Sequence, residues 1–276
     1  MNADIIFKNM CHNIIKNGYS SEGQDVRPRW KDGTPAHTIK QFGVVNRYDL
    51  YVEFPIMSLR PTNYKAAIDE ILWIWQKKSN NVNELNSKIW DAWADPSGSI
   101  GKAYGYQLGI KHKYKEGEFD QVDRVLYDLK NNPYSRRIIT NLYNHQDLHE
   151  MGLYPCAYSV TFNVTGNKLN MILNQRSQDV LVANNWNVCQ YAILLHMFAQ
   201  VSNLQVGELV HVIADAHIYD RHIPIVKNLI SNGKTYDGVE FRINKDIDNF
   251  YDFSIDDFEF VNYKHGPQIK NIEVAI

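Results

Sequence analysis

Apolar residues recur at helical spacing in four segments of this chain. Residues 5–16 and 64–76 each carry one apolar face, and residues 119–130 do so until an Asn-Asn-Pro stretch ends the pattern. Residues 187–204 are apolar nearly all round, which indicates a helix buried in a large core. We therefore predict four helices over these ranges.

Strict alternation of apolar and polar residues marks two further segments. Residues 158–164 and 168–174 alternate with a period of two and flank a Thr-Gly-Asn turn, so they predict a β-hairpin. Residues 207–219 form a more continuous apolar run, which predicts a buried strand. Helices and strands alternate irregularly along the chain, and this order favours the α+β class over a doubly wound sheet.

Composition narrows the class of protein. The 276 residues are 44% hydrophobic and contain no low-complexity linker, so we expect one continuous domain over residues 1–276. A net charge of −2 gives no case for DNA or an anionic membrane as a partner. No apolar run is long enough to span a bilayer, and the first residues lack a signal-peptide core. Three cysteines without metal-site spacing predict a reduced, cytoplasmic protein without a metal site.

Cys156 is the strongest candidate for chemistry. A free cysteine is most often a buried structural thiol. However, the predicted hairpin starts just after Cys156, and its return strand brings Arg176 and Ser177 back toward residue 157. An arginine there would hold an anion and lower the thiol pKa through its charge.

Three other polar features allow both a structural and a functional interpretation. Arg136 and Arg137 form either a solvated surface pair or a phosphate-binding pair. His217 and Tyr219 point to the same face at a strand end, where they bind a ligand hydroxyl or complete the core. Glu70 faces solvent, or it is a carboxyl in an apolar wall with a raised pKa.

Trp90 and Trp93 form core packing or a stacking platform. One nucleophile, several arginines, a carboxyl group and aromatic walls together suit covalent catalysis on a phosphorylated, planar small molecule. A Cys-His hydrolase fits less well, because no histidine directly follows Cys156.

Seven motifs in order carry a family resemblance over nearly the whole chain. They are Ile71–Trp75 (ILWIW), Ile89–Trp93 (IWDAW), Gly101–Gln107 (GKAYGYQ), Asn132–Arg137 (NPYSRR), Tyr154–Cys156 (YPC), Gln175–Asp179 (QRSQD) and Asp215–Tyr219 (DAHIY). On these motifs the chain resembles the thymidylate synthase family. The resemblance implies a mixed or antiparallel sheet that is flanked by helices and used for dimerisation.

The same resemblance implies a reaction and its substrates. The activity would be reductive methylation of dUMP to dTMP by 5,10-methylenetetrahydrofolate, which leaves as dihydrofolate. Cys156 would attack C6 of the uracil. Glu70 and Tyr104 would assist proton transfer, and Asn187 would bind the uracil edge.

The remaining implied roles concern the two ligands. The dUMP phosphate would bind Arg176, Ser177 and Arg27, together with Arg136 and Arg137 of the other subunit of a homodimer, although Arg29 competes with Arg27 for this role. Gln175 is expected at the dUMP site, and His217 and Tyr219 would hold the deoxyribose hydroxyl. Asp179 would bind the pterin and take part in the chemistry. The other residues expected at the folate are Arg60, Asn63, Trp90, Trp93, Ala183 and Ala275.

Five positions depart from the family pattern. Ala157 stands where histidine usually follows the cysteine, so we expect fewer hydrogen bonds there rather than inactivity. Ala183 replaces a glycine, and Trp186 enlarges the aromatic wall. Arg60 replaces a lysine, which keeps the positive charge near the folate but changes its geometry. Asn63 replaces a histidine that contacts the folate in the family.

Two other hypotheses remain at this point. A pyrimidine-nucleotide hydroxymethylase of the same fold would let water capture the methylene intermediate. Asn187 favours uracil over cytosine, and an apolar C-terminus favours exclusion of water, but neither feature excludes a dUMP hydroxymethylase. A non-catalytic binder would not need the thiol of Cys156.

Overall fold

The computed structural model describes residues 2–276, and it confirms all four predicted helices. These are α1 (Asn2–Asn17), α2 (Tyr64–Trp75), α4 (Gln121–Asn131) and α5 (Asn184–Val201). Two further helices are α3 (Gly105–Gly109) and α6 (Ile223–Asn232).

A seven-stranded mixed sheet forms the centre of the molecule. Its strands run in the order β1-β2-β9-β7-β6-β5, with β8 beside β9. Pairing is parallel between β7 and β9 and between β8 and β9, and antiparallel elsewhere. The strands are β1 (Tyr19–Ser20), β2 (Thr38–Asp49), β5 (Ile139–Asn141), β6 (Ala157–Thr165), β7 (Lys168–Gln175), β8 (Gln178–Asp179) and β9 (Gln205–Tyr219). The α+β prediction is therefore confirmed.

Two small ribbons and several single turns complete the structure. The ribbons are β3 (His112–Tyr114) with β4 (Gly117–Phe119), and β10 (Glu240–Ile243) with β11 (Phe258–Val261). Because Phe119 belongs to β4 and Asp120 caps α4, this helix starts two residues later than the apolar pattern predicts. Helix α5 starts three residues before the predicted Asn187, because polar Asn184 and Asn185 are buried in its first turn.

The predicted hairpin is present and positions the candidate thiol. Gly166 takes a positive φ of 63° in the turn, a backbone conformation that glycine adopts without strain. From this turn β7 returns along β6 until Ala157 pairs with Gln175. The backbone N–H of Arg176 then donates to the carbonyl of Cys156 at 3.0 Å, so the two residues are fixed side by side.

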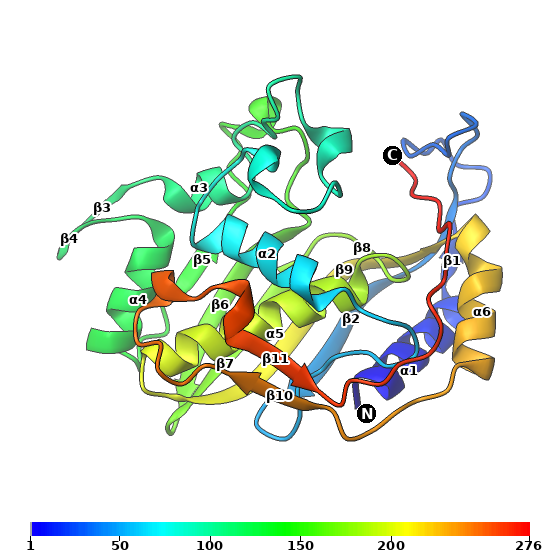
Figure 1. Cartoon of the computed structure of the whole chain (residues 1–276). Helices are drawn as coiled ribbons and strands as arrows, with labels where there is room; N and C mark the ends of the chain where they lie inside the picture. Colours follow the sequence, from blue (N-terminus) through cyan, green and yellow to red (C-terminus); the bar gives the residue numbers. More distant parts are fainter. Residues whose placement is uncertain (1) are drawn as a thin grey trace.

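Helix α5 packs directly on the sheet, and α2 packs on α5 (Figure 1). Buried residues occur on all sides of α5, from Val188 to Ala199, because it is enclosed between the sheet and α2. Helix α1 covers β2 and β9 farther along the sheet and contacts α6. This stacking places the first turn of α5, the middle of α2 and the start of β6 near one another.

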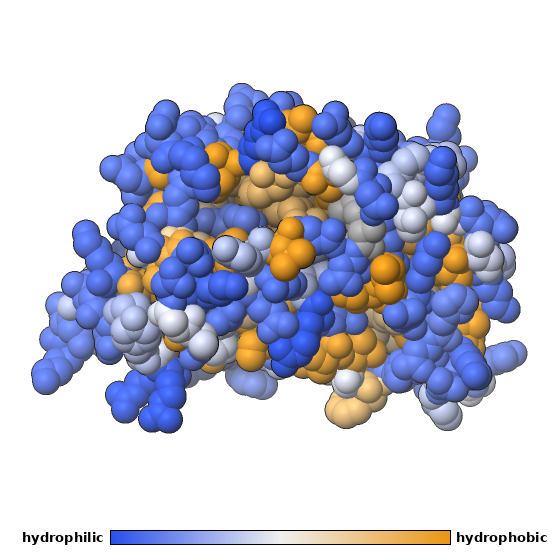
Figure 2. Space-filling view, turned by 90° about the horizontal axis from the view of Figure 1, so that it is seen from below, coloured by the Kyte–Doolittle hydropathy of each residue, from blue (hydrophilic) through white to orange (hydrophobic). Residues whose placement is uncertain are grey.

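Several large apolar side chains remain exposed on the strands. They include Phe42, which is 88% exposed, Val45, Ile139 and Ile172. On the face seen in Figure 2, apolar residues form small patches between hydrophilic ones. Exposed apolar side chains of this size along one sheet are typical of a protein–protein contact.

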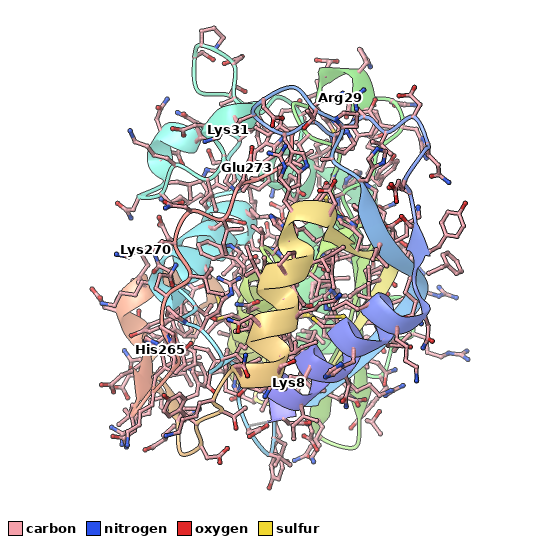
Figure 3. All side chains as sticks on the ribbon, turned by 90° about the vertical axis from the view of Figure 1, so that its right-hand side faces the viewer. Lys8, Arg29, Lys31, His265, Lys270 and Glu273 are labelled. Carbon is pink, nitrogen blue, oxygen red and sulfur yellow. The ribbon has the colours of Figure 1, made fainter. Side chains whose placement is uncertain are left out.

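The C-terminal tail is docked against the segment around Arg29. Ile276 and Arg29 exchange two backbone hydrogen bonds, of 3.1 and 2.8 Å. The carboxylate of Glu273 accepts from the backbone N–H of Lys31 at 2.9 Å and pairs with Arg221 at 2.9 Å. Figure 3 shows Arg29, Lys31 and Glu273 gathered at one end of the molecule. The tail and the segment around Arg29 are therefore joined as a short ladder.

Candidate active site

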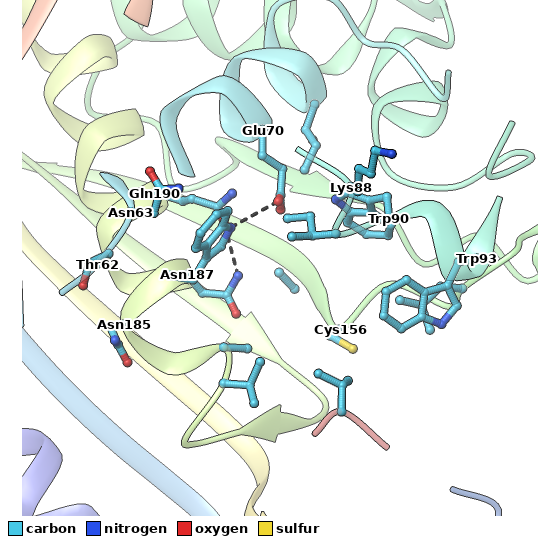
Figure 4. Close-up of a pocket in the computed structure, with 18 of the residues that line it drawn as sticks. Thr62, Asn63, Glu70, Lys88, Trp90, Trp93, Cys156, Asn185, Asn187 and Gln190 are labelled. Carbon is cyan, nitrogen blue, oxygen red and sulfur yellow. Dashed lines mark hydrogen bonds between the residues drawn. The ribbon is translucent and has the colours of Figure 1, made fainter. Parts of the chain in front are cut away.

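A cavity of about 810 Å³ lies between α2, α5, the segment at residues 88–93 and the C-terminal tail. Its volume is in the range of small-molecule sites. Glu70, Asn187 and Cys156 face this space, with Trp90 and Trp93 at one side (Figure 4). The other expected residues that line it are Arg60, Asn63, Tyr104, Gln175 and Ala183.

Arg176 lies beside the thiol, as the hairpin predicts. Its Nη2 is 3.7 Å from the Sγ of Cys156. The same guanidinium donates to the carbonyl of Tyr154 at 2.8 Å and to that of Pro155 at 3.1 Å. Two backbone acceptors thus hold the cation in place, so its position does not depend on a bound ligand.

The pKa of Cys156 is nevertheless raised above its usual value, and this corrects the expectation of a lowered pKa. Burial raises the pKa most, while the charge of Arg176, the hydroxyl of Tyr104 and the more distant charge of Arg27 lower it. Taking a thiol out of water disfavours its anion, and one neighbouring arginine offsets only part of that cost. The resting thiol is therefore mainly protonated at neutral pH.

Tyr104 is held in a strained conformation beside the thiol. Its φ of 46° and ψ of −106° lie in a region that bulky residues rarely adopt. Its hydroxyl accepts a hydrogen bond from the backbone N–H of Cys156 at 3.0 Å, and its ring packs edge-on against Trp90. Strain that the surroundings enforce in this way is typical of functional sites.

The structure distinguishes between the two N-terminal arginines. The guanidinium of Arg29 donates to the carbonyls of Val26 and Pro28 in its own loop. Arg27 is exposed, and its charge lowers the pKa values of both Cys156 and Tyr219. Arg27 is therefore the arginine of the two whose charge reaches Cys156 and Tyr219.

Glu70 is a buried carboxyl in the cavity wall rather than a solvated one. It is 5% exposed, and burial raises its pKa to about 7, while the polar groups of Gln190, Trp186 and Trp90 limit the rise. The indole N–H of Trp186 donates to Glu70 Oε2 at 3.1 Å. A carboxyl with a pKa near neutrality both accepts and donates protons at cellular pH.

A chain of hydrogen bonds fixes the orientation of the Asn187 amide. Burial lowers the pKa of His211 to about 3, so its ring is neutral and its Nε2–H donates to Oε1 of Gln175. Gln175 Nε2 then donates to Asn187 Oδ1 at 3.2 Å, and Asn187 Nδ2 donates to Gln190 Oε1 at 3.1 Å. Within residues 2–276, the amide makes no further hydrogen bond, so one N–H and one lone pair are left for a ligand.

His217 and Tyr219 lie on one side of β9, as their spacing predicts. Their rings meet edge to face at 5.0 Å. The Nδ1 of His217 lies 2.9 Å from Asp215, whose other oxygen accepts from Lys40 at 2.9 Å. These two rings do not line the main cavity, but the charge of Cys156 reaches the phenol of Tyr219.

The far wall of the cavity carries polar atoms that lack partners. Arg60 is 8% exposed; its Nη2 donates to the carbonyl of Leu181, and its Nε has no partner within residues 2–276. The buried Oδ1 of Asn185 also has no hydrogen-bond partner within residues 2–276. Asn63 lines the wall and also caps α2. This wall suits a ligand with an anionic group and hydrogen-bonding edges.

Besides His217 and Tyr219, the expected residues Arg27, Arg176, Ser177, Asp179 and Ala275 do not line the cavity. Asp179 accepts the backbone N–H groups of Leu181 and Val182 at 3.0 and 3.1 Å, and thereby shapes the turn before α5. Ala275 does not line the cavity, although its neighbours Val274 and Ile276 do. Ser177 lies at the turn between β7 and β8.

Arg136 and Arg137 are exposed and are not brought to the cavity of their own chain.

Sequence reasoning also missed several residues of the wall. Gln190 is the most informative, because a glutamine three residues after Asn187 inside an apolar helix was a visible signal. Lys88 and Gln268 also line the cavity, but they lie in loops without any pattern that would single them out.

Within residues 2–276, no group of three or more His, Cys, Asp or Glu side chains is arranged to hold a metal ion. No helix in this range is long and apolar enough to cross a bilayer.

A half-buried thiol, a carboxyl with a pKa near neutrality and a preset amide around one cavity define an enzyme of covalent catalysis on a small molecule. Comparison with known proteins specifies the family. The thymidylate synthase family model matches residues 5–276. "Thymidylate synthase 1" of Bacillus subtilis is 44% identical over 275 residues, which are 98% of each chain, and "Thymidylate synthase" of Bacillus licheniformis is 45% identical over 268 residues, which are 95% of each.

The solved structure of thermostable thymidylate synthase A from Bacillus subtilis superposes with a TM-score of 0.94 at 43% identity, covering 99% of both chains. The chain belongs to the thymidylate synthase family. Its activity is that of a thymidylate synthase, a methyltransferase, and the hydroxymethylase alternative is not favoured.

Proposed function

We propose that this chain methylates dUMP to dTMP with 5,10-methylenetetrahydrofolate, through a covalent bond between Cys156 and uracil C6. The observation that carries the proposal is the placement of the thiol. It faces the same cavity as Glu70 and Asn187, with the cation of Arg176 3.7 Å from its sulfur.

The preset amide of Asn187 explains selection of uracil. Its free lone pair matches the N3–H of uracil, and its free N–H matches O4. Cytosine presents the opposite polarity on this edge, with an acceptor at N3 and a donor at N4. Because Gln175 and Gln190 hold the amide from both sides, flipping it to suit cytosine would break two hydrogen bonds.

The dUMP phosphate would be bound by the cationic side chains near the thiol. Arg176, Ser177 and Arg27 would bind the phosphate, while His217 and Tyr219 would hold the deoxyribose hydroxyl. Arg136 and Arg137 would come from the second subunit of a homodimer, with the exposed apolar side chains of the sheet as the contact. A molecule of this kind would work in the cytoplasm without DNA or a membrane as partner.

The thiol proton leaves as the carbon–sulfur bond forms. The sulfur pair adds to C6, and the C5–C6 π pair moves to C5 and O4, so that C5 becomes the nucleophile toward the one-carbon unit. Glu70, with its pKa near 7, would pass protons to and from the uracil edge through water. Tyr104 would assist loss of the C5 proton from its position beside Cys156.

The remaining wall fits the reduced folate, which supplies the one-carbon unit and the hydride. Trp90 and Trp93 offer aromatic faces, and the unpaired Nε of Arg60 offers a cation for the glutamate tail. Asn63, Ala183 and the tail around Ala275 would border the same ligand, and Asp179 would contact the pterin. Val274 and Ile276 at the lip would keep water from the reacting carbon.

Trapping with 5-fluoro-dUMP tests the covalent step. With methylenetetrahydrofolate, the wild-type chain is expected to form an adduct on Cys156 that survives denaturation, while Cys156→Ser forms none and still binds dUMP. Product analysis then identifies the reaction, because dihydrofolate absorbance must rise together with dTMP. Formation of 5-hydroxymethyl-dUMP without dihydrofolate would contradict the proposal, as would a wild-type chain that forms no adduct.

A further inference from the structure

Trp186 connects the two helices that carry the reacting groups. It projects from the first turn of α5, and its indole N–H donates to Oε2 of Glu70, on α2, at 3.1 Å. The rest of the indole lines the cavity and is only partly buried. A single side chain therefore forms part of the ligand-facing wall and also contacts the buried carboxyl.

The other polar groups around Glu70 are placed less favourably. The indole N–H of Trp90 is buried without a hydrogen-bond partner within residues 2–276. Gln190 donates one amide N–H to the carbonyl of Ala67 at 3.2 Å and accepts from Asn187, and its amide also lowers the pKa of Glu70. Across residues 2–276, Trp186 supplies the one hydrogen bond of ordinary geometry that reaches Glu70.

An indole N–H is a donor only, so it stabilises the ionised carboxylate and distinguishes between its two oxygens. We propose that Trp186 is a positioning residue, which holds Oε2 of Glu70 and leaves Oε1 free for proton exchange at the substrate. The inference rests on the proposed role of Glu70 in proton transfer. Without Trp186, the carboxyl would rotate and would ionise less readily in its apolar surroundings.

Other ionisable groups also face this carboxyl. Asp69 lies next to it on α2, Tyr191 approaches from α5, and Tyr104 approaches from the start of α3. Asp69 raises the pKa of Glu70 through its negative charge. Burial raises the pKa values of both tyrosines above the usual range, so these phenols stay neutral while Glu70 titrates.

Trp186→Phe keeps an aromatic wall and removes only the donor. We expect the pKa of Glu70, followed by ¹³C NMR of labelled glutamate, to rise by roughly one unit or more, because a hydrogen bond to a charged group is lost. The acidic limb of the kcat–pH profile should move upward by the same amount, while KM for dUMP stays within about twofold. Trp30→Phe is the matched control, since it removes an indole bond of 3.0 Å to another carboxylate, Asp220, outside the cavity. It should leave the pKa of Glu70 unchanged.

A double-mutant cycle separates positioning from general packing. If Trp186 acts through the carboxylate, the loss in kcat caused by Trp186→Phe should largely disappear in a Glu70→Gln background. An equal loss in both backgrounds, or an unmoved pKa of Glu70, would overturn the inference. If Glu70→Gln itself does not slow turnover, the proposed role of Glu70 is wrong, whatever the NMR titration shows. Adduct formation with 5-fluoro-dUMP reports whether each variant is folded.

Discussion

The guanidinium of Arg176 lies 3.7 Å from the sulfur of Cys156, yet two backbone carbonyls determine where it sits. The local backbone thus holds the Arg176 guanidinium beside Cys156 whether or not a substrate is bound. Burial still keeps the thiol pKa above its usual value. The nucleophilicity of Cys156 therefore depends on how far neighbouring positive charges offset the rise in its pKa that burial causes.

Arg176→Ala should make the thiol less reactive. Removal of the nearest cation destabilises the thiolate and raises the pKa of Cys156 further, and each unit lowers the thiolate fraction about tenfold at a given pH. The rate of iodoacetamide alkylation at pH 8 should fall accordingly, and its pH profile should move upward. Arg176→Lys keeps a charge but not the planar fork, so it should recover part of the rate. Equal alkylation rates in all three proteins would contradict the argument.

Glu70→Gln should stabilise the fold at neutral and higher pH. Because the pKa of Glu70 is raised to about 7 when folded, the folded state binds this proton more tightly than the unfolded state does. Its ionisation costs stability progressively as pH rises from the ordinary glutamate pKa through about 7, and the full cost is on the order of 3 kcal/mol. The variant should exceed wild type in free energy of unfolding at pH 8, with the difference vanishing near pH 4.

Denaturant titrations at several pH values check this prediction. Asp69→Asn is a useful comparison, because it removes the neighbouring charge and leaves the buried carboxyl in place. A stability difference for Glu70→Gln that does not change between pH 4 and 8 would show that burial of the charge is not its cause.

Gln190→Met should weaken dUMP binding without blocking the covalent step. Methionine preserves the length of the side chain but cannot accept the hydrogen bond that Asn187 Nδ2 donates at 3.1 Å. The loss of one neutral hydrogen bond, about 1 kcal/mol, corresponds to a roughly fivefold higher KM for dUMP. Discrimination against dCMP should also fall, because the amide is freer to flip. Steady-state kinetics with both nucleotides measures this, and unchanged discrimination would count against the preset amide.

Removal of residues 274–276 should affect both ligands. Val274 and Ile276 line the cavity, and Ile276 also pairs with Arg29, two residues from Arg27. We expect a large rise in KM for the folate and a smaller loss of dUMP affinity. Glu273→Gln serves as control, because it weakens the exposed pair with Arg221 but keeps the backbone ladder, and pairs of this kind contribute little. Isothermal titration with dUMP and folate kinetics together would show whether the tail serves both sites.

The fold was largely predictable because its signals are local. The hairpin at residues 157–175 combines a period of two with a turn glycine, and this alone brings Arg176 to Cys156. Helix boundaries were less predictable where polar residues are buried, as Asn184 and Asn185 are at the start of α5. Periodicity cannot indicate that an asparagine is buried.

The site was predictable in its residues but not in its energetics. Spacing suggested that Arg176 would lower the thiol pKa, yet the net direction depends on how deeply Cys156 is enclosed by segments far apart in sequence. The link between Trp186 and Glu70 likewise spans 116 positions. Such contacts arise only when α2 packs on α5, and no local pattern encodes them.

The two ends of the chain differ in how well they would accept an affinity tag or a fusion partner. The backbone of Ile276 is hydrogen-bonded to Arg29, and Ile276 also lines the cavity. Helix α1, by contrast, packs against β2, β9 and α6, on a part of the sheet that α5 does not cover (Figure 1). An affinity tag or fusion partner joined after Ile276 would emerge where the ligands must enter. Purification handles and biosensor fusions for this enzyme therefore belong ahead of α1.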